Sequence, residues 1–516
     1  MKAFSRSLIV GAMAVSCPLS AESVAPLVWT TCSAVGGTPT DVALRTECAT
    51  LAVPRDYAHP SAGTLNLDVI RVTAKAGRGE RHDGTLFLEP DEFGAPLTEA
   101  IPAVASRWLE GDDHWRNVSN RLDLVGLAQR RMKGGGGHDC VAAASTIPRP
   151  GIDLTEGDAA AAGSLALAVA TACQNDPMAS HIGTSPRIED IERLRDALGR
   201  NTLHLLGAGR GGWVLARYAE RHPDRVGRML LDGSWDVDGS VAEAMELRIS
   251  ERGRAFRRAI AALRDAPDRY DWRIEAADIH ARFARLPAPL RAAWSPSIVD
   301  APHLAAALAM ARGIDAGVAP EPAALHGHLT ATRLAATEAD DRAVRKAGSA
   351  LIAALGGAND LDAYGFGARA NDAGTAALAT AFAARCNDGY WGRSPRYWHD
   401  RARELRELWP STTGEELFQG QVCSQWPGVF GPSGVPVLTR PFLMVHAEYD
   451  AEAPLRGAAL TLQTHDKARL VVARGLVAHE VSLHPEAACV SAAAGRYLAD
   501  GVLPDAMVTN CVQGAE

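Results

Sequence analysis

The stretch that decides the fold is Leu203-His204-Leu205-Leu206-Gly207-Ala208-Gly209-Arg210-Gly211-Gly212-Trp213. A short, mostly apolar run leads into a series of glycines, and a helical pattern follows from about Gly212 to Arg221. Glycine tolerates a sharp turn that leaves little room for side chains. The stretch therefore predicts a strand, a tight turn at Gly209 and a helix, which is the unit from which parallel sheets are built.

The alternation of strand and helix patterns continues on both sides of this stretch. A helix pattern over 188–198 precedes it, with a Thr184-Ser185-Pro186 start signal and Gly199 at its end, and a strand pattern over 225–231 follows. Short apolar or alternating runs predict strands at 64–73, 85–88, 122–125, 442–446 and 468–472, and a last helix at 486–498. We therefore predict an α/β fold with a mostly parallel sheet and helices on both faces.

The pattern changes between about residues 236 and 435. This region is rich in alanine and arginine and contains helical stretches at 254–263, 304–311 and 343–355, with few strand signals. At 516 residues the chain is too long for one simple core. We predict a core built from residues 23–235 and 436–516, a helical cap inserted as residues 236–435, and a loop at Gly134 to Gly137.

The first residues have the layout of a secretory signal. Lys2 and Arg6 precede an apolar run at 8–15 and small residues at 16–21, and the run is too short to span a bilayer. We predict a signal peptide over 1–22 and a secreted or periplasmic protein, with lipid anchoring through Cys17 as the less favoured alternative. No later stretch predicts a transmembrane helix. The net charge of −8 comes without a basic stripe, which argues against a nucleic-acid partner.

The chain has nine cysteines, and setting Cys17 aside leaves an even number. Behind an export signal, an even set predicts disulfides. The sequence alone does not fix the pairs, but chain order favours joining neighbours: Cys32 to Cys48, Cys140 to Cys173, Cys386 to Cys423, and Cys489 to Cys511. If all of them pair, no cysteine remains to serve as a substitute nucleophile.

Two residues of a hydrolytic triad follow the later strand patterns. Asp450 comes after the strand at 442–446, and His479 after the strand at 468–472. The Gly-x-Ser-x-Gly turn of α/β-hydrolases carries a nucleophilic serine, and an acid and a histidine follow it along the chain. Here Gly207 and Gly211 keep the turn, while Gly209 stands where the serine would be. The acid would orient the imidazole, but the turn has no attacking group.

Longer segments resemble the secreted tripeptidyl aminopeptidase-like branch of the α/β-hydrolases, which are relatives of prolyl aminopeptidases. They are CATLAVPRDY at 48–57, HPDRVGRMLLDG at 222–233, CND at 386–388, and the tail 489–511 with its YLADGVLP. The likeness spans nearly the whole mature chain. It implies an α/β-hydrolase fold with a helical cap, substrates that are peptides or related amides and esters held by the free amino end, and no metal or organic cofactor.

The chain departs from that family at three places. Gly209 replaces the serine, and Arg210 replaces the aromatic residue that usually follows it. The glycine- and proline-rich oxyanion loop is replaced by 89–94, where Asp91 and Glu92 would oppose a developing negative charge. An aspartate-x-arginine-glycine signature is replaced by Ala128-Gln129-Arg130-Arg131. Three separate losses predict a degenerate hydrolase and argue against a single substitution made in the laboratory.

Three functional hypotheses stay open. The first is a catalytically inactive protein that keeps its cleft for a peptide or small-molecule ligand, preferentially a cationic one because of Asp91 and Glu92. The second is an active peptidase or esterase in which another nucleophile, such as Ser234, works with His479 and Asp450. The third is a protein with no remaining role. The sequence does not give the oligomeric state.

Two further features have simpler interpretations. His479 and His484 are five residues apart, so they would not share a helix face as the histidines of a zinc-peptidase helix do, and we predict no metal site. Asp388 and Arg210 would either line the pocket or form a salt bridge where the cap meets the core.

Overall fold

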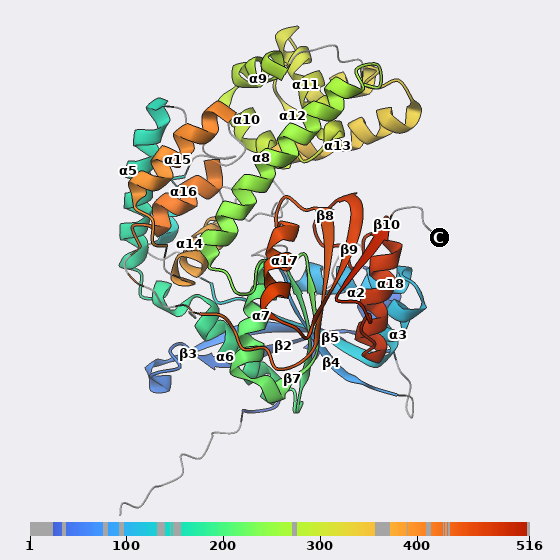
Figure 1. Cartoon of the computed structure of the whole chain (residues 1–516). Coiled ribbons are helices and arrows are strands. Elements are labelled where there is room, and N and C mark those ends of the chain that lie inside the picture. Colours follow the sequence, from blue (N-terminus) through green and yellow to red (C-terminus); the bar gives the residue numbers. More distant parts are fainter. Residues whose placement is uncertain are drawn as a thin grey trace, which may run out of the picture.

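The computed structural model describes residues 24–32, 38–75, 81–91, 97–131, 140–144, 146–147, 156–270, 276–356, 372–389, 391–408, 414–426, 428, 431 and 434–512. Within these ranges one ten-stranded sheet runs through the centre of the molecule, in the order β1-β2-β3-β5-β4-β6-β7-β8-β9-β10 (Figure 1). The strands are β1 (Thr30–Thr31), β2 (Thr46–Pro54), β3 (Thr64–Val72), β4 (Gly84–Glu89), β5 (Leu122–Leu127), β6 (Leu203–Ala208), β7 (Val226–Asp232), β8 (Phe442–Tyr449), β9 (Ala468–Val477) and β10 (Val508–Val512).

The sheet is antiparallel at one edge and parallel over the rest. β1, β2, β3 and β5 pair antiparallel in that order, whereas all pairs from β5 to β10 are parallel. The predicted α/β-hydrolase fold with a mostly parallel sheet is thus confirmed. The sequence patterns missed β10, because its residues are mostly exposed at the edge and give no apolar alternation.

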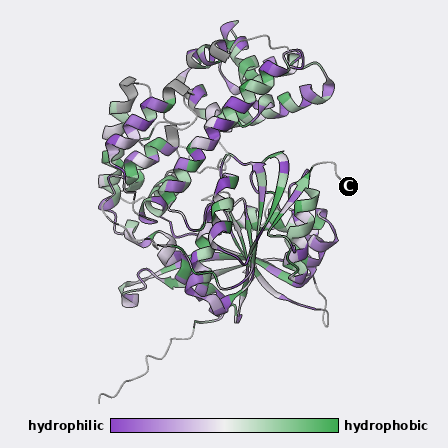
Figure 2. Ribbon diagram, viewed as in Figure 1, coloured by the Kyte–Doolittle hydropathy of each residue, from purple (hydrophilic) through white to green (hydrophobic). Residues whose placement is uncertain are grey.

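Helices cover both faces of the sheet. On one face lie α6 (Thr184–Ala197), α7 (Arg210–Arg221) and α17 (Leu455–Thr464), and on the other α2 (Leu97–Glu110), α3 (Asp113–Arg121) and α18 (Ala488–Asp500). Successive strand side chains alternate between the two layers. Phe87 and Val125 belong to one buried cluster, and their neighbours Leu86 and Leu124 belong to the other. Figure 2 shows hydrophobic residues concentrated on the strands between these layers.

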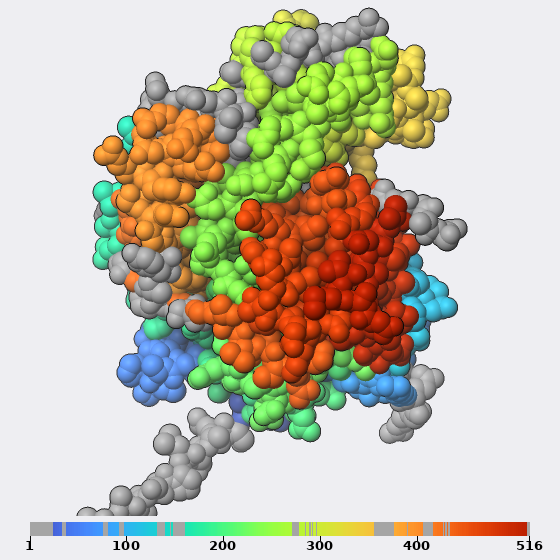
Figure 3. All heavy atoms as spheres, viewed as in Figure 1, coloured from blue at the N-terminus to red at the C-terminus, as the bar shows by residue number. Residues whose placement is uncertain are grey.

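A helical cap lies over the carboxyl ends of the strands (Figure 1). Its helices are α8 (Val241–Asp265), α9 (Ala276–Arg285), α10 (Ala288–Trp294), α11 (Ala301–Asp315), α12 (Pro322–Ala331), α13 (Glu338–Gly356), α14 (Asp372–Asn387), α15 (Pro395–Leu408) and α16 (Gly414–Cys423). In Figure 3 the yellow part of this cap overhangs the red C-terminal part of the core, with a hollow between them.

The cap also includes an earlier stretch, within 23–235, that was predicted to belong to the core. α4 (Cys140–Ala144) packs against α14, and α5 (Glu156–Gln174) packs against α15 and α16. The buried side chains of Ala166, Val169 and Ala170 on α5 belong to the apolar cluster that extends from one face of the sheet to cap residues such as Phe382 and Phe418. A helical pattern predicts an apolar face but not the layer that buries it, so this segment could not be assigned from its periodicity.

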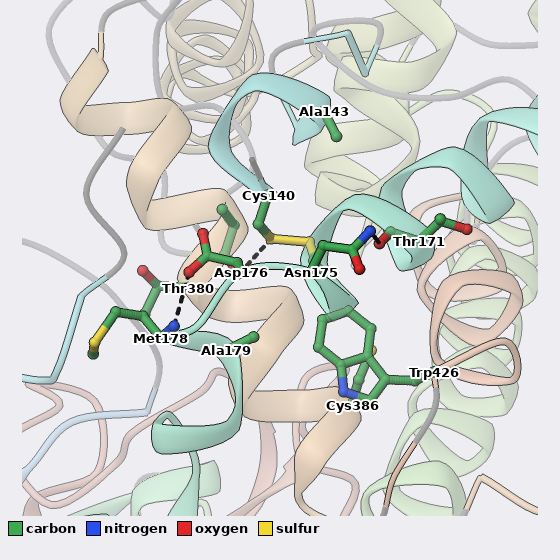
Figure 4. The surroundings of a disulfide bond; sticks show 12 residues. Cys140, Ala143, Thr171, Asn175, Asp176, Met178, Ala179, Thr380, Cys386 and Trp426 are labelled. Atoms are coloured by element: carbon green, nitrogen blue, oxygen red, sulfur yellow. Dashed lines mark hydrogen bonds between the residues drawn. A yellow bond between two sulfur atoms is a disulfide. The ribbon is translucent and has the colours of Figure 1, made fainter. Parts of the chain in front are cut away.

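The four predicted disulfides are all formed: Cys32–Cys48, Cys140–Cys173, Cys386–Cys423 and Cys489–Cys511. Two of them hold the cap together, since Cys140–Cys173 joins α4 to α5 and Cys386–Cys423 joins α14 to α16. Figure 4 shows that Cys386 and Trp426 lie close to the first of these bridges.

Removing Cys489–Cys511 is expected to destabilise the edge of the sheet. This bridge ties α18 to β10 across 22 residues. A loop of this size contributes about 2–4 kcal/mol by restricting the unfolded chain. We expect the double substitution Cys489→Ala with Cys511→Ala to lower the midpoint of guanidinium unfolding correspondingly, compared with the wild type under oxidising conditions. An unchanged midpoint would mean that the bridge does not stabilise the fold.

Some predictions lie outside the described residues. They are the signal peptide with Cys17, the loop at Gly134 to Gly137, and Glu92. Among the residues that the structure does describe, no helix is long and apolar enough to cross a membrane.

Candidate functional site

The site is centred on the turn between β6 and α7. Gly209 has φ +47°, a conformation that side-chain-bearing residues rarely adopt, and its N–H donates to the carbonyl of Asp232 at the end of β7 (3.0 Å). Gly211 lies against the loop that follows β4, and a Cβ at Gly211 would be 2.3 Å from the carbonyl oxygen of Glu89. The two glycines thus let the turn close tightly beneath that loop.

The carboxylate of Asp91 fills the space that a side chain at position 209 would occupy. A Cβ built on Gly209 would lie 1.9 Å from Oδ1 of Asp91 and 2.1 Å from its Cγ. The backbone N–H of Arg210 donates to the same Oδ1 (2.5 Å). In the serine enzymes of this fold, the N–H of the residue after the nucleophile is an oxyanion donor. Asp91 therefore occupies the position of the missing side chain and accepts a hydrogen bond from the N–H donor beside it.

Asp450 and His479 are in contact, in the arrangement of an acid and a base. Nδ1 of His479 is 2.8 Å from Oδ2 of Asp450, and the other carboxylate oxygen accepts the N–H groups of Glu452 (2.8 Å) and Ala453 (2.9 Å). The side chain of Asp450 is fully buried. These bonds fix the carboxylate, which in turn fixes the orientation of the imidazole.

The loop that carries His479 is anchored from β7. Asp232, the last residue of that strand, accepts the N–H groups of Val481 (2.7 Å) and Ser482 (2.9 Å), and burial raises the pKa of its carboxyl. Glu480, directly after the histidine, has φ +58° although it is not glycine. Strain of this kind persists where the surroundings fix the backbone, here by the two bonds to Asp232.

The imidazole of His479 lies between two carboxylates. Its Nε2 is 3.3 Å from Oδ2 of Asp91, on the side opposite Asp450. Burial alone would lower the pKa of His479, but the charges of Asp450 and Asp91 and their contacts with the ring raise it well above its usual value. The pKa of Asp91 is lowered, because the contact with His479 and the charges of His479 and Arg248 outweigh burial. About a fifth of each side chain is exposed, 21% for His479 and 17% for Asp91.

Arg210 contributes its backbone to the site and its side chain to the cap interface. The guanidinium forms a buried ion pair with Asp388, which follows α14, and a hydrogen bond with the hydroxyl of Thr184 (3.3 Å). Asp388 also accepts the N–H of Thr184 at the start of α6 (2.6 Å). Of the two interpretations of Arg210 and Asp388, the structure shows the salt bridge.

The acidic residue at the end of β4 is neutralised. Glu89 forms a buried ion pair with Arg187 (2.7 Å), and Gln129 donates to Glu89 as well (3.1 Å). Asp91, one of the two carboxylates predicted near the oxyanion position, lies at the turn. Its position follows from strand order, because β4 and β6 are neighbours and their carboxyl ends meet.

Ser234, the alternative nucleophile, has its hydroxyl engaged elsewhere. The hydroxyl donates to the carbonyl of Trp235 (3.0 Å), the residue is 1% exposed, and a Cβ on Gly212 would be 2.4 Å from its oxygen. Ser234 thus packs against the start of α7. Gly233, the residue before Ser234, lies next to the ring of His479.

A cluster of four buried charges connects the cap to the site, and no local sequence pattern indicates it. Arg248 and Arg252 of α8 form ion pairs with Glu416 of α16 and with Glu452, two residues after Asp450. Arg248 is also one of the charges that lower the pKa of Asp91, so the cluster acts on the site electrostatically. In the part of the chain that the structure describes, no group of three or more potential ligands could hold a metal ion.

Comparisons with known proteins find similar chains among peptidases. A family model described as "TAP-like protein" matches residues 410–511. The tripeptidyl aminopeptidase of Streptomyces coelicolor is 25% identical over 494 residues, covering 92% of this chain and 84% of the relative. The chain is a relative of the tripeptidyl aminopeptidase-like α/β-hydrolases. The serine protease Hip1 of Mycobacterium tuberculosis is 27% identical over 43% of this chain and 42% of its own length.

Among solved structures, the proline iminopeptidase of Mycobacterium smegmatis aligns with 87% of this chain and 97% of its own, at 13% identity and a TM-score of 0.33. The overall likeness to that structure is low, and the fold assignment of this aminopeptidase-like protein follows from its own sheet topology.

Proposed function

We propose that this protein is an exported α/β-hydrolase-fold protein that has lost serine peptidase activity and keeps the cleft between sheet and cap for a peptide or small-molecule ligand. The observation that carries the proposal is the carboxylate of Asp91, which fills the space of a side chain at Gly209 and accepts the N–H of Arg210. Four disulfides support export, because such bonds persist in oxidising compartments.

Three parts of acyl transfer are affected at once. There is no hydroxyl or thiol at Gly209, and loss of the serine alone costs serine proteases about a million-fold in turnover. The N–H of Arg210 already binds an anion, so it is not open to the oxyanion of a substrate. The pKa of His479 is raised well above its usual value between two carboxylates, which favours the charged imidazole, and a charged imidazole cannot accept a proton.

A fluorophosphonate probe tests this proposal directly. We expect no labelling of the wild-type protein and no turnover of tripeptide amides or acyl esters, together with a thermal shift when a peptide ligand is added. Mapping any labelled peptide by mass spectrometry would separate the hypotheses. A covalent adduct on Ser234, abolished in a Ser234→Ala variant, would contradict the proposal and favour the alternative nucleophile.

A further inference from the structure

We propose that Asp91 is itself a nucleophile, and that the site hydrolyses small alkyl electrophiles, molecules with a leaving group on a saturated carbon, through an ester formed on Asp91. This inference rests on the proposed function in one respect, the absence of a serine nucleophile. The inference goes beyond the proposed function because it assigns a separate reaction to Asp91, His479 and Asp450.

The two oxygens of Asp91 face different partners. Oδ1 accepts the N–H of Arg210 (2.5 Å), whereas Oδ2 lies 3.3 Å from Nε2 of His479. Carboxylates act as nucleophiles in covalent catalysis when they stay ionised. The contact with His479 and the charges of His479 and Arg248 lower the pKa of Asp91, which favours its ionised form, and 17% of its side chain is exposed.

The arrangement selects saturated carbon over acyl carbon. Attack of a carboxylate on a peptide or ester carbonyl would give a mixed anhydride, which is less stable than its precursor, and the oxyanion donor is already used by Oδ1. Attack on a saturated carbon needs no oxyanion donor, because the negative charge develops on the leaving group. In that step Oδ2 forms a bond to carbon, and the leaving group departs with the electron pair of the broken bond.

The second step uses the same contacts. Esterification removes the charge of Asp91, so the pKa of His479 falls, its proton is released to solvent, and the ring becomes a base oriented by Asp450. A water molecule that gives its proton to Nε2 attacks Cγ of Asp91, and the oxyanion forms on Oδ1, where the N–H of Arg210 already points. The bond from Cγ to Oδ2 then breaks, and the alcohol leaves with the proton from His479. The net reaction consumes one water and gives the alcohol and the protonated leaving group.

The intermediate can be trapped and located. We would incubate the His479→Gln variant with 1-bromobutane and, separately, with styrene oxide, and measure the mass of the intact protein and of its peptides. The glutamine removes the base needed for the second step. The expected result is about one adduct per protein molecule, on the peptide that contains Asp91. With at least one of the two probes, turnover should also be at least a hundred-fold slower than in the wild type.

An isotope experiment tests the wild-type protein without any substitution. After multiple turnovers in water labelled with oxygen-18, the carboxylate of Asp91 is expected to carry the label, because water attacks Cγ. Asp91→Asn should show neither label nor adduct, whereas Asp505→Asn, which changes an exposed carboxylate far along the chain, should behave as wild type.

The outcomes separate this inference from the proposed function. If Asp91 carries neither an adduct nor oxygen-18 with either probe, the inference is overturned, whereas the proposed loss of serine peptidase activity is unaffected. Adducts spread equally over exposed carboxylates would overturn it too, since they indicate plain chemical alkylation. Labelling of the wild type by a fluorophosphonate would contradict the proposed function instead.

Discussion

Replacing Gly209 with serine is expected not to restore serine peptidase activity, although it restores the residue that the family uses. The Cβ of the new serine would overlap Asp91, at 1.9 Å from Oδ1, so the carboxylate must leave and its bond from the N–H of Arg210 is lost. Overpacking of this kind typically costs about 1–3 kcal/mol. We expect Gly209→Ser to lower the melting temperature and to remain unlabelled by a fluorophosphonate.

The double variant Asp91→Gly with Gly209→Ser should behave differently. Removing the carboxylate gives the serine room, frees the N–H of Arg210 and leaves His479 with Asp450 alone. One freed oxyanion donor is worth about 100- to 1000-fold in rate, so the double variant should be labelled at least a hundred-fold faster than the single one. The matched control is Asp91→Gly alone, which has no serine at the turn. Equal labelling of the single and double variants would show that Asp91 does not block the site.

Breaking the ion pair of Arg130 is expected to give the largest loss of stability. Its guanidinium binds both oxygens of Asp190 (2.7 and 2.8 Å) and the carbonyls of Pro54 and Arg55, with almost no exposure on either side chain. Tyr57 donates to the same carboxylate (2.8 Å). Asp190→Ala leaves a buried positive charge without its partner, which typically costs about 3–5 kcal/mol.

Chemical unfolding of Asp190→Ala measures that cost. Asp265→Ala is the matched control, because the pair of Asp265 with Arg264 is more than half exposed and such pairs contribute about 0–1 kcal/mol. The same experiment tests whether Arg130, part of the altered signature at 128–131, stabilises the contact between β2 and α6. A loss for Asp190→Ala no larger than that of the control would mean that Arg130 does not hold β2 and α6 together.

The parts predicted from sequence are those encoded by local pattern and chain order. The strand before Gly209, the helix after it and the strands that precede Asp450 and His479 follow from short apolar runs, and disulfide pairing of neighbours was also correct. The placement of α4 and α5 in the cap depends on tertiary contacts, which periodicity does not encode.

The position of Asp91 shows the same limit at the site. Its acidity was visible in the sequence, and it was predicted to lie in the oxyanion region. That it fills the space at Gly209 depends on β4 lying beside β6 and on the absence of a Cβ at the turn. The pairing of Arg210 with Asp388 likewise brings together residues 178 positions apart in sequence.

The protonation of His479 tests most directly whether Asp91 has taken the serine's place beside the imidazole. Nitrogen-15 NMR of the ring during a pH titration reports its pKa. We predict that His479 in the wild type stays charged well above pH 6.5, and that Asp91→Asn lowers its pKa. Because the pKa of His479 is higher in the folded than in the unfolded protein, its charged form stabilises the fold at pH values below the folded-state pKa. The difference in unfolding free energy between wild type and Asp91→Asn should therefore shrink as the pH rises through the pKa of His479. An imidazole that titrates near pH 6.5 in both proteins would show that Asp91 has not taken that place.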